Sequence, residues 1–235
     1  MTYTPRFSLL CPTRHRPVQA RELLESVRAS AAGDVELILR LDEDDPTLNQ
    51  YYDQVSGSDV RFVVGPRVVL SQCWNDAADE ARADLLMQLG DDIRFRSVDW
   101  DDQISAEFDK QPDRILLVHG RDGIQDDKVA THGVIHRRWM ETLGYFVPPI
   151  FASDYNDMWL TEIADGVGRR RYLPDVYTEH LHPVAGKGDW DITHQERMER
   201  HRAENCDALW INTADRRALD VGKLKAAIRE TVEAS

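Results

Sequence analysis

Cysteine is scarce in this chain of 235 residues. The three that occur, Cys11, Cys73 and Cys206, are widely spaced and match no metal-binding pattern. No run of about 18 apolar residues is present, and the first residues lack a basic region followed by an apolar one. We therefore expect reduced thiols in a soluble, cytoplasmic protein that is neither secreted nor bound to a membrane.

Basic residues are also few. Lys and Arg number 29 against 42 Asp and Glu, which gives a formal net charge of -13. Because an acidic surface repels a phosphate backbone, duplex nucleic acid is not the expected partner, although local cations can still bind a phosphorylated ligand. The chain also lacks a linker rich in Gly, Ser or Pro, which favours one domain.

Short apolar runs alternate with segments of helical periodicity, and this order predicts an α/β fold with a mainly parallel sheet. The expected strands cover residues 7–11, 35–41, 61–64, 85–89, 114–119, 133–136 and 175–183. The residues expected to cap helices are Ser71, Ser97, Ser153 or Asp154, and Thr193 with Glu196 as a capping box. The basic run 169–171 is expected on a solvated turn, and the last helix over residues 215–232.

The most informative motif is Gly90-Asp91-Asp92, which follows the apolar strand 85–89. Ligands bind at the carboxyl ends of strands in open α/β sheets, and paired carboxylates there suit a hard divalent cation that carries a diphosphate. The same three residues also suit a tight, solvated turn. This motif by itself excludes neither interpretation.

Two other strand ends carry polar side chains. The first strand runs into Pro12, Thr13, Arg14 and Arg16, a basic loop that can hold a phosphate, stack on a base, or form a solvated turn. The second strand ends at Asp42, which can accept hydrogen bonds from a ribose or a base.

Later segments supply further candidates. Asp154 begins a helix, where it can cap the helix or accept a proton from a hydroxyl. His180 and His182 lie two residues apart on the expected strand, so both point to one face and can bind a metal. Lys187 stands between two glycines, in a loop that can close over phosphates.

In this order, these features resemble the GT-A fold of nucleotide-sugar glycosyltransferases, broadly the family 2 type found in phages and bacteria. The resemblance spans about residues 7–190. It implies a single Rossmann-like domain over residues 1–192, with a mixed, mainly parallel central sheet flanked by helices. Residues 193–235 would form a C-terminal helical extension packed on this domain.

The resemblance also implies residue roles. Mn²⁺ or Mg²⁺ would be held by Asp92 with His182 or His180, and Asp154 would be the catalytic base, with Asp157 in reserve because Ser153 replaces the first acid of the family's Glu-Asp element. The residues implied to bind the donor nucleotide are Pro12, Thr13, Arg14, Arg16, Asp42, Arg67, Asp91 and Lys187.

The implied activity is metal-dependent transfer of a hexosyl group from a nucleoside diphosphate sugar, with a UDP-sugar as the expected donor, to a hydroxyl group. The acceptor is open, and a modified DNA base and a glycan are both candidates; the former needs a basic surface such as residues 137–138 and 169–171. A nucleotidyltransferase is an alternative, but residues 12–17 lack the glycines that it needs. A noncatalytic nucleotide-sugar or metal-binding module is the other alternative.

Overall fold

The computed structural model describes residues 4–233. The strands of this part are β1 (Phe7–Thr13), β2 (Val35–Asp42), β3 (Val60–Gly65), β4 (Leu85–Gln88), β5 (Ile93–Phe95), β6 (Leu117–Arg121), β7 (Val134–His136) and β8 (Arg170–His180). The helices are α1 (Pro17–Ser30), α2 (Leu48–Gln54), α3 (Leu70–Asp79), α4 (Trp100–Asp109), α5 (Arg137–Leu143), α6 (Asn156–Val167), α7 (Ile192–Ala203), α8 (Cys206–Asn212) and α9 (Ala214–Glu233), and a 3₁₀ turn covers Pro183–Ala185.

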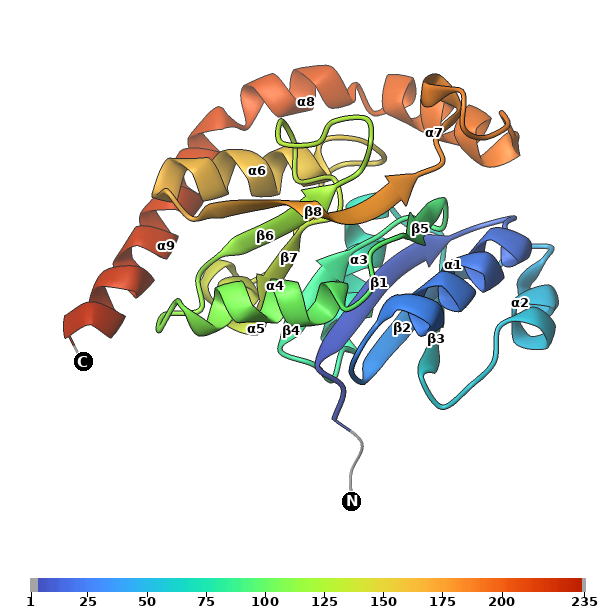
Figure 1. The fold of residues 1–235 in the computed structure, drawn as a ribbon. Coiled ribbons are helices and arrows are strands. Elements are labelled where there is room, and N and C mark those ends of the chain that lie inside the picture. The colour runs from blue at the N-terminus through green and yellow to red at the C-terminus, as the bar shows by residue number, and fades with distance from the viewer. Residues whose placement is uncertain (1–3, 234–235) are drawn as a thin grey trace.

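The strands form one curled sheet in the order β3-β2-β1-β4-β7-β6-β8-β5 (Figure 1). The strands β1 to β4 run parallel, and β6 runs parallel to β8. The strand β7 is antiparallel to both of its neighbours, and β5 pairs antiparallel with β8 at the edge. The mixed, mainly parallel sheet expected from the sequence is therefore confirmed.

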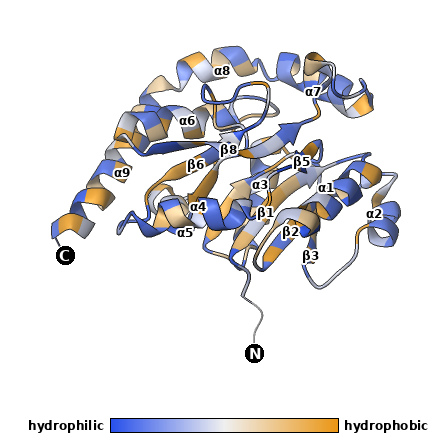
Figure 2. Ribbon diagram, viewed as in Figure 1, coloured by the Kyte–Doolittle hydropathy of each residue, from blue (hydrophilic) through white to orange (hydrophobic). Residues whose placement is uncertain are grey.

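Helices cover both faces of this sheet. On one face, α1 and α4 pack against β1 and β5. The ring of Trp100 packs edge-on against Phe7 and at a tilt against Phe95. The other face is covered by α3, α5, α6 and α9, with Trp139 and Trp159 fully buried beneath them. Figure 2 shows the most hydrophobic residues concentrated on the central strands. Burial of these side chains is the main stabilising contribution to the fold.

The register of the sheet brings the predicted motifs to one edge. Thr13 of β1 lies opposite Leu41 of β2, and Asp42 lies opposite Gly65 of β3. Because the strands β1 to β4 are parallel, the segments that follow their last residues emerge on the same side. This edge is where an open α/β sheet binds ligands.

The C-terminal helices pass over this edge and down the side of the sheet (Figure 1). Asp220 of α9 is buried and accepts hydrogen bonds from Tyr145 and from Trp159 Nε1, the latter at 3.2 Å. By contrast, α7 buries only His194 and is held by polar side chains. The predicted division of the chain at residue 192 stays a prediction.

The expected helix caps are wrong. The hydroxyl of Ser71 donates to the carbonyl of Phe151 at 3.0 Å, and Ser97 donates to Asp175 at 2.7 Å. Neither Ser153 nor Asp154 caps α6, and Thr193 donates to the carbonyl of Arg14 while Asp191 caps α7. In most of these cases a carbonyl from a distant segment satisfies the hydroxyl instead, a contact that local sequence does not reveal.

The basic run 169–171 was expected on a turn, and that expectation is wrong for its last two residues. Arg170 and Arg171 begin β8, where they pair with Leu117 and Val118 of β6. Their charged ends lie at the surface, in ion pairs with Asp165 and Glu107.

Candidate active site

A cavity of about 660 Å³ opens at the carboxyl edge of the sheet, beneath α7. Its volume is in the range typical of small-molecule sites. Among the predicted site residues, those that line it are Pro12, Thr13, Arg14, Arg16, Asp42, Arg67, Asp91, Asp92, Asp154, Asp157, His180 and His182. The fold thus brings together residues that are up to 170 positions apart in the sequence.

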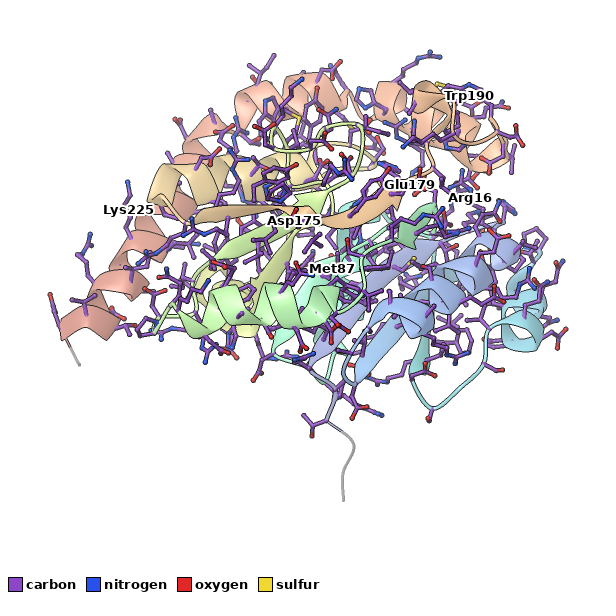
Figure 3. The ribbon with its side chains drawn as sticks, viewed as in Figure 1. Arg16, Met87, Asp175, Glu179, Trp190 and Lys225 are labelled. Carbon is purple, nitrogen blue, oxygen red and sulfur yellow. The ribbon has the colours of Figure 1, made fainter. Side chains whose placement is uncertain are left out.

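Asp91 is held inside the protein by two neighbours. Its Oδ2 accepts a hydrogen bond from Thr13 Oγ1 at 2.6 Å, and its Oδ1 accepts one from Arg16 at 2.9 Å. The guanidinium of Arg16 also binds both oxygens of Asp191, at 2.7 and 2.8 Å. Figure 3 shows Arg16 on the side of the sheet toward α7. Both carboxylate oxygens of Asp91 are therefore occupied, and Arg16 ties the first loop to the start of α7.

Asp92 faces His180 across the cavity floor. Its Oδ2 lies 3.4 Å from His180 Nε2, and His180 Nδ1 lies 3.7 Å from Oδ2 of Asp122. Burial lowers the pKa of His180, but the two carboxylates outweigh it and raise this pKa to about 9. Burial likewise opposes ionisation of Asp92, yet His180 holds the pKa of that carboxyl well below its ordinary value. The pair is charged at neutral pH.

His182 and His132 flank His180. The rings of His180 and His182 are 5.3 Å apart, and those of His132 and His180 are 5.2 Å apart. Burial, with the neighbouring charge of His180, lowers the pKa of His182 to about 4 and that of His132 to about 3. His182 lies beyond the end of β8, and its Nδ1 accepts the N–H of Val184 at 3.2 Å. In its neutral form His182 therefore carries its proton on Nε2.

A cluster of opposite charges lies at the end of β2. Arg14 donates to Asp42 at 3.3 Å and to Asp44 at 2.5 Å. Glu196 of α7 accepts a hydrogen bond from Arg67 at 2.6 Å and lies 3.6 Å from Arg14. Burial raises the pKa of Asp42, although Arg14 opposes this shift. The cluster presents both cations and carboxylates to the cavity.

Asp154 contacts two basic side chains of α7. One oxygen accepts hydrogen bonds from Arg197, with Nε at 3.0 Å, and the other lies 2.5 Å from His201 Nδ1. Both oxygens of the Asp154 carboxylate are therefore engaged by side chains of α7.

Asp157 lies one turn further along α6 and has no such partner. Its side chain accepts only a backbone hydrogen bond, from Met158 N–H at 2.8 Å, and forms no ion pair within residues 4–233. Burial, with the nearby charge of Asp154, raises the pKa of Asp157 to about 6. A carboxylate with a pKa near neutrality can exchange a proton at physiological pH.

Solved structures of other proteins share this architecture. The mannosyltransferase PcManGT from Pyrobaculum calidifontis, in complex with GDP-Man and Mn²⁺, aligns with a TM-score of 0.61 at 15% identity, over 100% of this chain and 77% of that chain. TarS 1-349 of S. aureus in complex with UDP-GlcNAc aligns with a TM-score of 0.56 at 15% identity, over 97% and 83% of the two chains. A second crystal structure of TarS 1-349 aligns with a TM-score of 0.55 at 14% identity, over 97% and 82% of the two chains.

The chain has a GT-A-like glycosyltransferase fold. No family description and no curated protein sequence matches the chain. At these identities the likeness to the solved structures concerns the fold. Within residues 4–233, no helix combines the length and the hydrophobicity needed to cross a bilayer.

In this GT-A-like fold, the residues expected to bind a metal are only partly preorganised. The described part of the chain contains no cluster of three or more His, Cys, Asp or Glu side chains in metal-binding geometry. However, two ligands at about 2.1 Å from one cation lie roughly 3 to 4 Å apart. The 3.4 Å between Asp92 and His180 fits such a pair, so these residues suit a cation whose other ligands come from a diphosphate and water.

Lys187 is the one predicted site residue that does not line the cavity. Its Nζ lies 3.1 Å from Glu179 and 3.2 Å from the hydroxyl of Tyr177. Contact with a phosphate in the cavity would require the loop of residues 183–190 to move.

The sequence analysis missed several residues that surround the cavity. The most important are His132, Glu196, Arg197 and His201, which line it, and Asp122, which lies behind His180. Asp122 follows a buried strand, as Asp42 and Asp91 do, so the same pattern pointed to it. No sequence signal placed the charged residues of α7 over the cavity, because their partners lie more than 40 positions away.

Proposed function

We propose that this protein is a metal-dependent glycosyltransferase that moves a hexosyl group from a nucleoside diphosphate sugar to an acceptor hydroxyl. The proposal rests mainly on one observation. A cavity of about 660 Å³, at the ligand-binding edge of a GT-A-like fold, gathers the carboxylates, histidines and arginines that this chemistry needs. Two structural neighbours carry GDP-Man with Mn²⁺ and UDP-GlcNAc, respectively.

The nucleoside and its phosphates would lie against the first loop and the ends of β2 and β3. Asp42, Arg14 and Arg67 offer acceptors and cations to the base, ribose and phosphates. Pro12 lines the same wall, and Thr13, Arg16 and Asp91 fix the loop through their hydrogen bonds.

Asp92 and His180 would hold Mn²⁺ or Mg²⁺. A cation at this position stabilises the negative charge that develops on a leaving diphosphate. We favour His180 over His182 as the metal ligand. Nδ1 of His182 accepts a backbone N–H, so the neutral ring carries its proton on Nε2 and has no free lone pair for a metal. Lys187 remains a candidate for the leaving diphosphate.

The catalytic base would be one of two aspartates on or just before α6. Asp154 is the residue that matches the family's motif, but Arg197 and His201 engage both of its oxygens. Asp157 has a pKa of about 6 and forms no ion pair with any other residue from 4 to 233, so we assign the base role to Asp157 and a supporting role to Asp154.

A UDP-sugar remains the preferred donor, with a GDP-sugar as the alternative that the PcManGT complex suggests. A modified DNA base and a glycan both remain candidate acceptors, with the net charge of -13 opposing the former. We also propose that the protein acts in the cytoplasm.

Calorimetric titration with uridine, guanosine, thymidine and adenosine diphosphates, with and without Mn²⁺, tests the proposal. We expect one nucleotide to bind in a metal-dependent way, and Asp92→Asn to abolish the metal dependence. Asp175→Asn, which changes an exposed carboxylate outside the cavity, is the matched control and should bind like the wild type.

Hydrolysis or transfer of the matching nucleotide-sugar then separates an enzyme from a noncatalytic binding module. Turnover that depends on Asp157 supports the transferase. Tight donor binding with no turnover, in the presence of a broad set of glycan and nucleoside acceptors, would favour the noncatalytic module. Binding of no nucleotide at all would refute the proposal.

A further inference from the structure

Asp122 lies directly after β6, beside His180. Its carboxylate faces Nδ1 of His180, whereas the other ring nitrogen, Nε2, faces Asp92 at the cavity. Asp122 is 2% exposed and does not line the cavity, so it cannot itself contact a donor there.

The position of the Asp122 carboxylate is fixed by the backbone. Its Oδ1 accepts three N–H groups, from Ile124 at 2.9 Å, Gln125 at 2.7 Å and Asp126 at 2.8 Å. Its own carbonyl accepts the N–H of His180 at 3.0 Å, which ties the end of β8 to the same turn. Asp122 therefore cannot turn away from the histidine without losing several hydrogen bonds.

The second oxygen, Oδ2, is buried and has no hydrogen-bond partner in the described part of the chain. A buried, charged acceptor without a partner is destabilising, so a donor close to it is favoured. This oxygen lies 3.7 Å from His180 Nδ1, with which it forms an ion pair. A small rotation of the imidazole brings the two into hydrogen-bond distance.

We propose that Asp122 is a positioning residue that takes the Nδ1 proton of His180 and thereby leaves Nε2 free to bind the divalent cation beside Asp92. The proposal rests on the metal-dependent transfer proposed above. A histidine that binds a metal commonly donates its other N–H to a carboxylate, and loss of that carboxylate lowers metal affinity about 10- to 100-fold.

The variant Asp122→Asn tests this role with little change in shape. The amide oxygen keeps the three backbone N–H groups, so the amide nitrogen replaces Oδ2 and donates toward Nδ1. Neutral His180 must then carry its proton on Nε2, which blocks the lone pair that faces Asp92. We expect Mn²⁺ affinity, measured with the preferred nucleoside diphosphate present, to fall about 10- to 100-fold.

Asp126→Asn is the matched control. Asp126 belongs to the same turn, and its Oδ1 accepts only the N–H of Gly123, at 2.8 Å, which an asparagine oxygen can also accept. This variant should bind Mn²⁺ like the wild type. An equal loss of affinity in both variants would assign the effect to the turn as a whole and overturn the proposal.

A second readout needs neither metal nor donor. Long-range ¹H–¹⁵N spectra of the metal-free protein, recorded at a pH where the spectra themselves show a neutral His180 ring, report which ring nitrogen carries the proton. We expect Nδ1 in the wild type and Nε2 in Asp122→Asn. The same tautomer in both proteins would overturn the proposal.

The two readouts also separate this proposal from the proposed function. If the tautomer changes as expected but the wild type binds no Mn²⁺, Asp122 positions His180 and the metal dependence of the proposed function is refuted. If the wild type binds Mn²⁺ and Asp122→Asn binds it equally well, the positioning role is refuted and the proposed function stands.

Discussion

Replacing Asp157 by Asn should make the protein more stable and remove its activity. The pKa of Asp157 is raised from 3.8 to about 6 because the carboxylate is partly buried in the cavity wall and lies near Asp154. At pH 7 the folded protein therefore holds a charge that the unfolded chain solvates better. The asparagine carries no charge and keeps the acceptor for Met158 N–H.

The size of the gain follows from this shift in pKa. One pKa unit corresponds to 1.36 kcal/mol, so a shift of about 2 units costs the folded protein up to about 3 kcal/mol at pH 7. Between pH 4 and pH 6 the folded state binds more protons at this site than the unfolded state, so this contribution to stability falls as pH rises. Below about pH 4 both states are protonated and the contribution disappears.

Denaturant unfolding of the wild type and Asp157→Asn at pH 4 and pH 7 measures the difference. We expect the variant to be more stable by up to about 3 kcal/mol at pH 7 and by less than about 1 kcal/mol at pH 4. Transfer should fall about 10²- to 10⁴-fold, while donor affinity changes little. The transfer rate of the wild type should rise with pH and level off above about pH 6.

Asp165→Asn is the control on the same helix. Its carboxylate is 51% exposed and pairs with Arg170, so its replacement should change stability by less than about 1 kcal/mol. A loss of stability in Asp157→Asn at pH 7, or a gain of equal size at pH 4, would refute the reasoning. Wild-type transfer rates in this variant would remove Asp157 as the base.

Two further predictions concern α7 and α9. Glu196→Gln should tighten nucleoside diphosphate binding by about 2- to 10-fold in calorimetry, because the negative charge of Glu196 no longer offsets the positive charges of Arg67 and Arg14. Weaker binding would show instead that Glu196 contacts the nucleotide. Arg217→Ala should lower the free energy of unfolding by about 2–4 kcal/mol, since this buried guanidinium lies 3.7 Å from the Trp210 ring and 2.7 Å from Glu162. The exposed Arg229→Ala on the same helix should have no measurable effect, and equal losses in both would contradict this account.

Much of the fold could be predicted because it is encoded locally. The segments that became β1, β2 and β4 are mostly apolar, and the helical spacing of Ala20, Leu23, Leu24 and Val27 was enough to predict α1. The polar residues after each parallel strand could be assigned to one edge by a general rule of α/β sheets. For these reasons, 12 of the 13 predicted site residues line one cavity.

The state of each side chain could not be predicted in the same way. The sequence identified Asp91, Asp92, Asp154 and Asp157 as acids near strand or helix ends. Only the tertiary structure shows that Thr13 and Arg16 donate hydrogen bonds to Asp91 and that α7 engages Asp154. It also shows that Asp157 forms no ion pair in the described part of the chain.

The sequence by itself determined most of the order of strands and helices along the chain, although not β5, α2 or α8, and the edge at which the polar motifs meet, because periodicity and strand-end chemistry act between near neighbours. The tertiary structure decided which charges pair, which carboxylate has a raised pKa, and that Asp122 lies behind His180. These properties depend on burial and on distances of a few ångströms between residues that are tens of positions apart, and no local pattern in the chain specifies them.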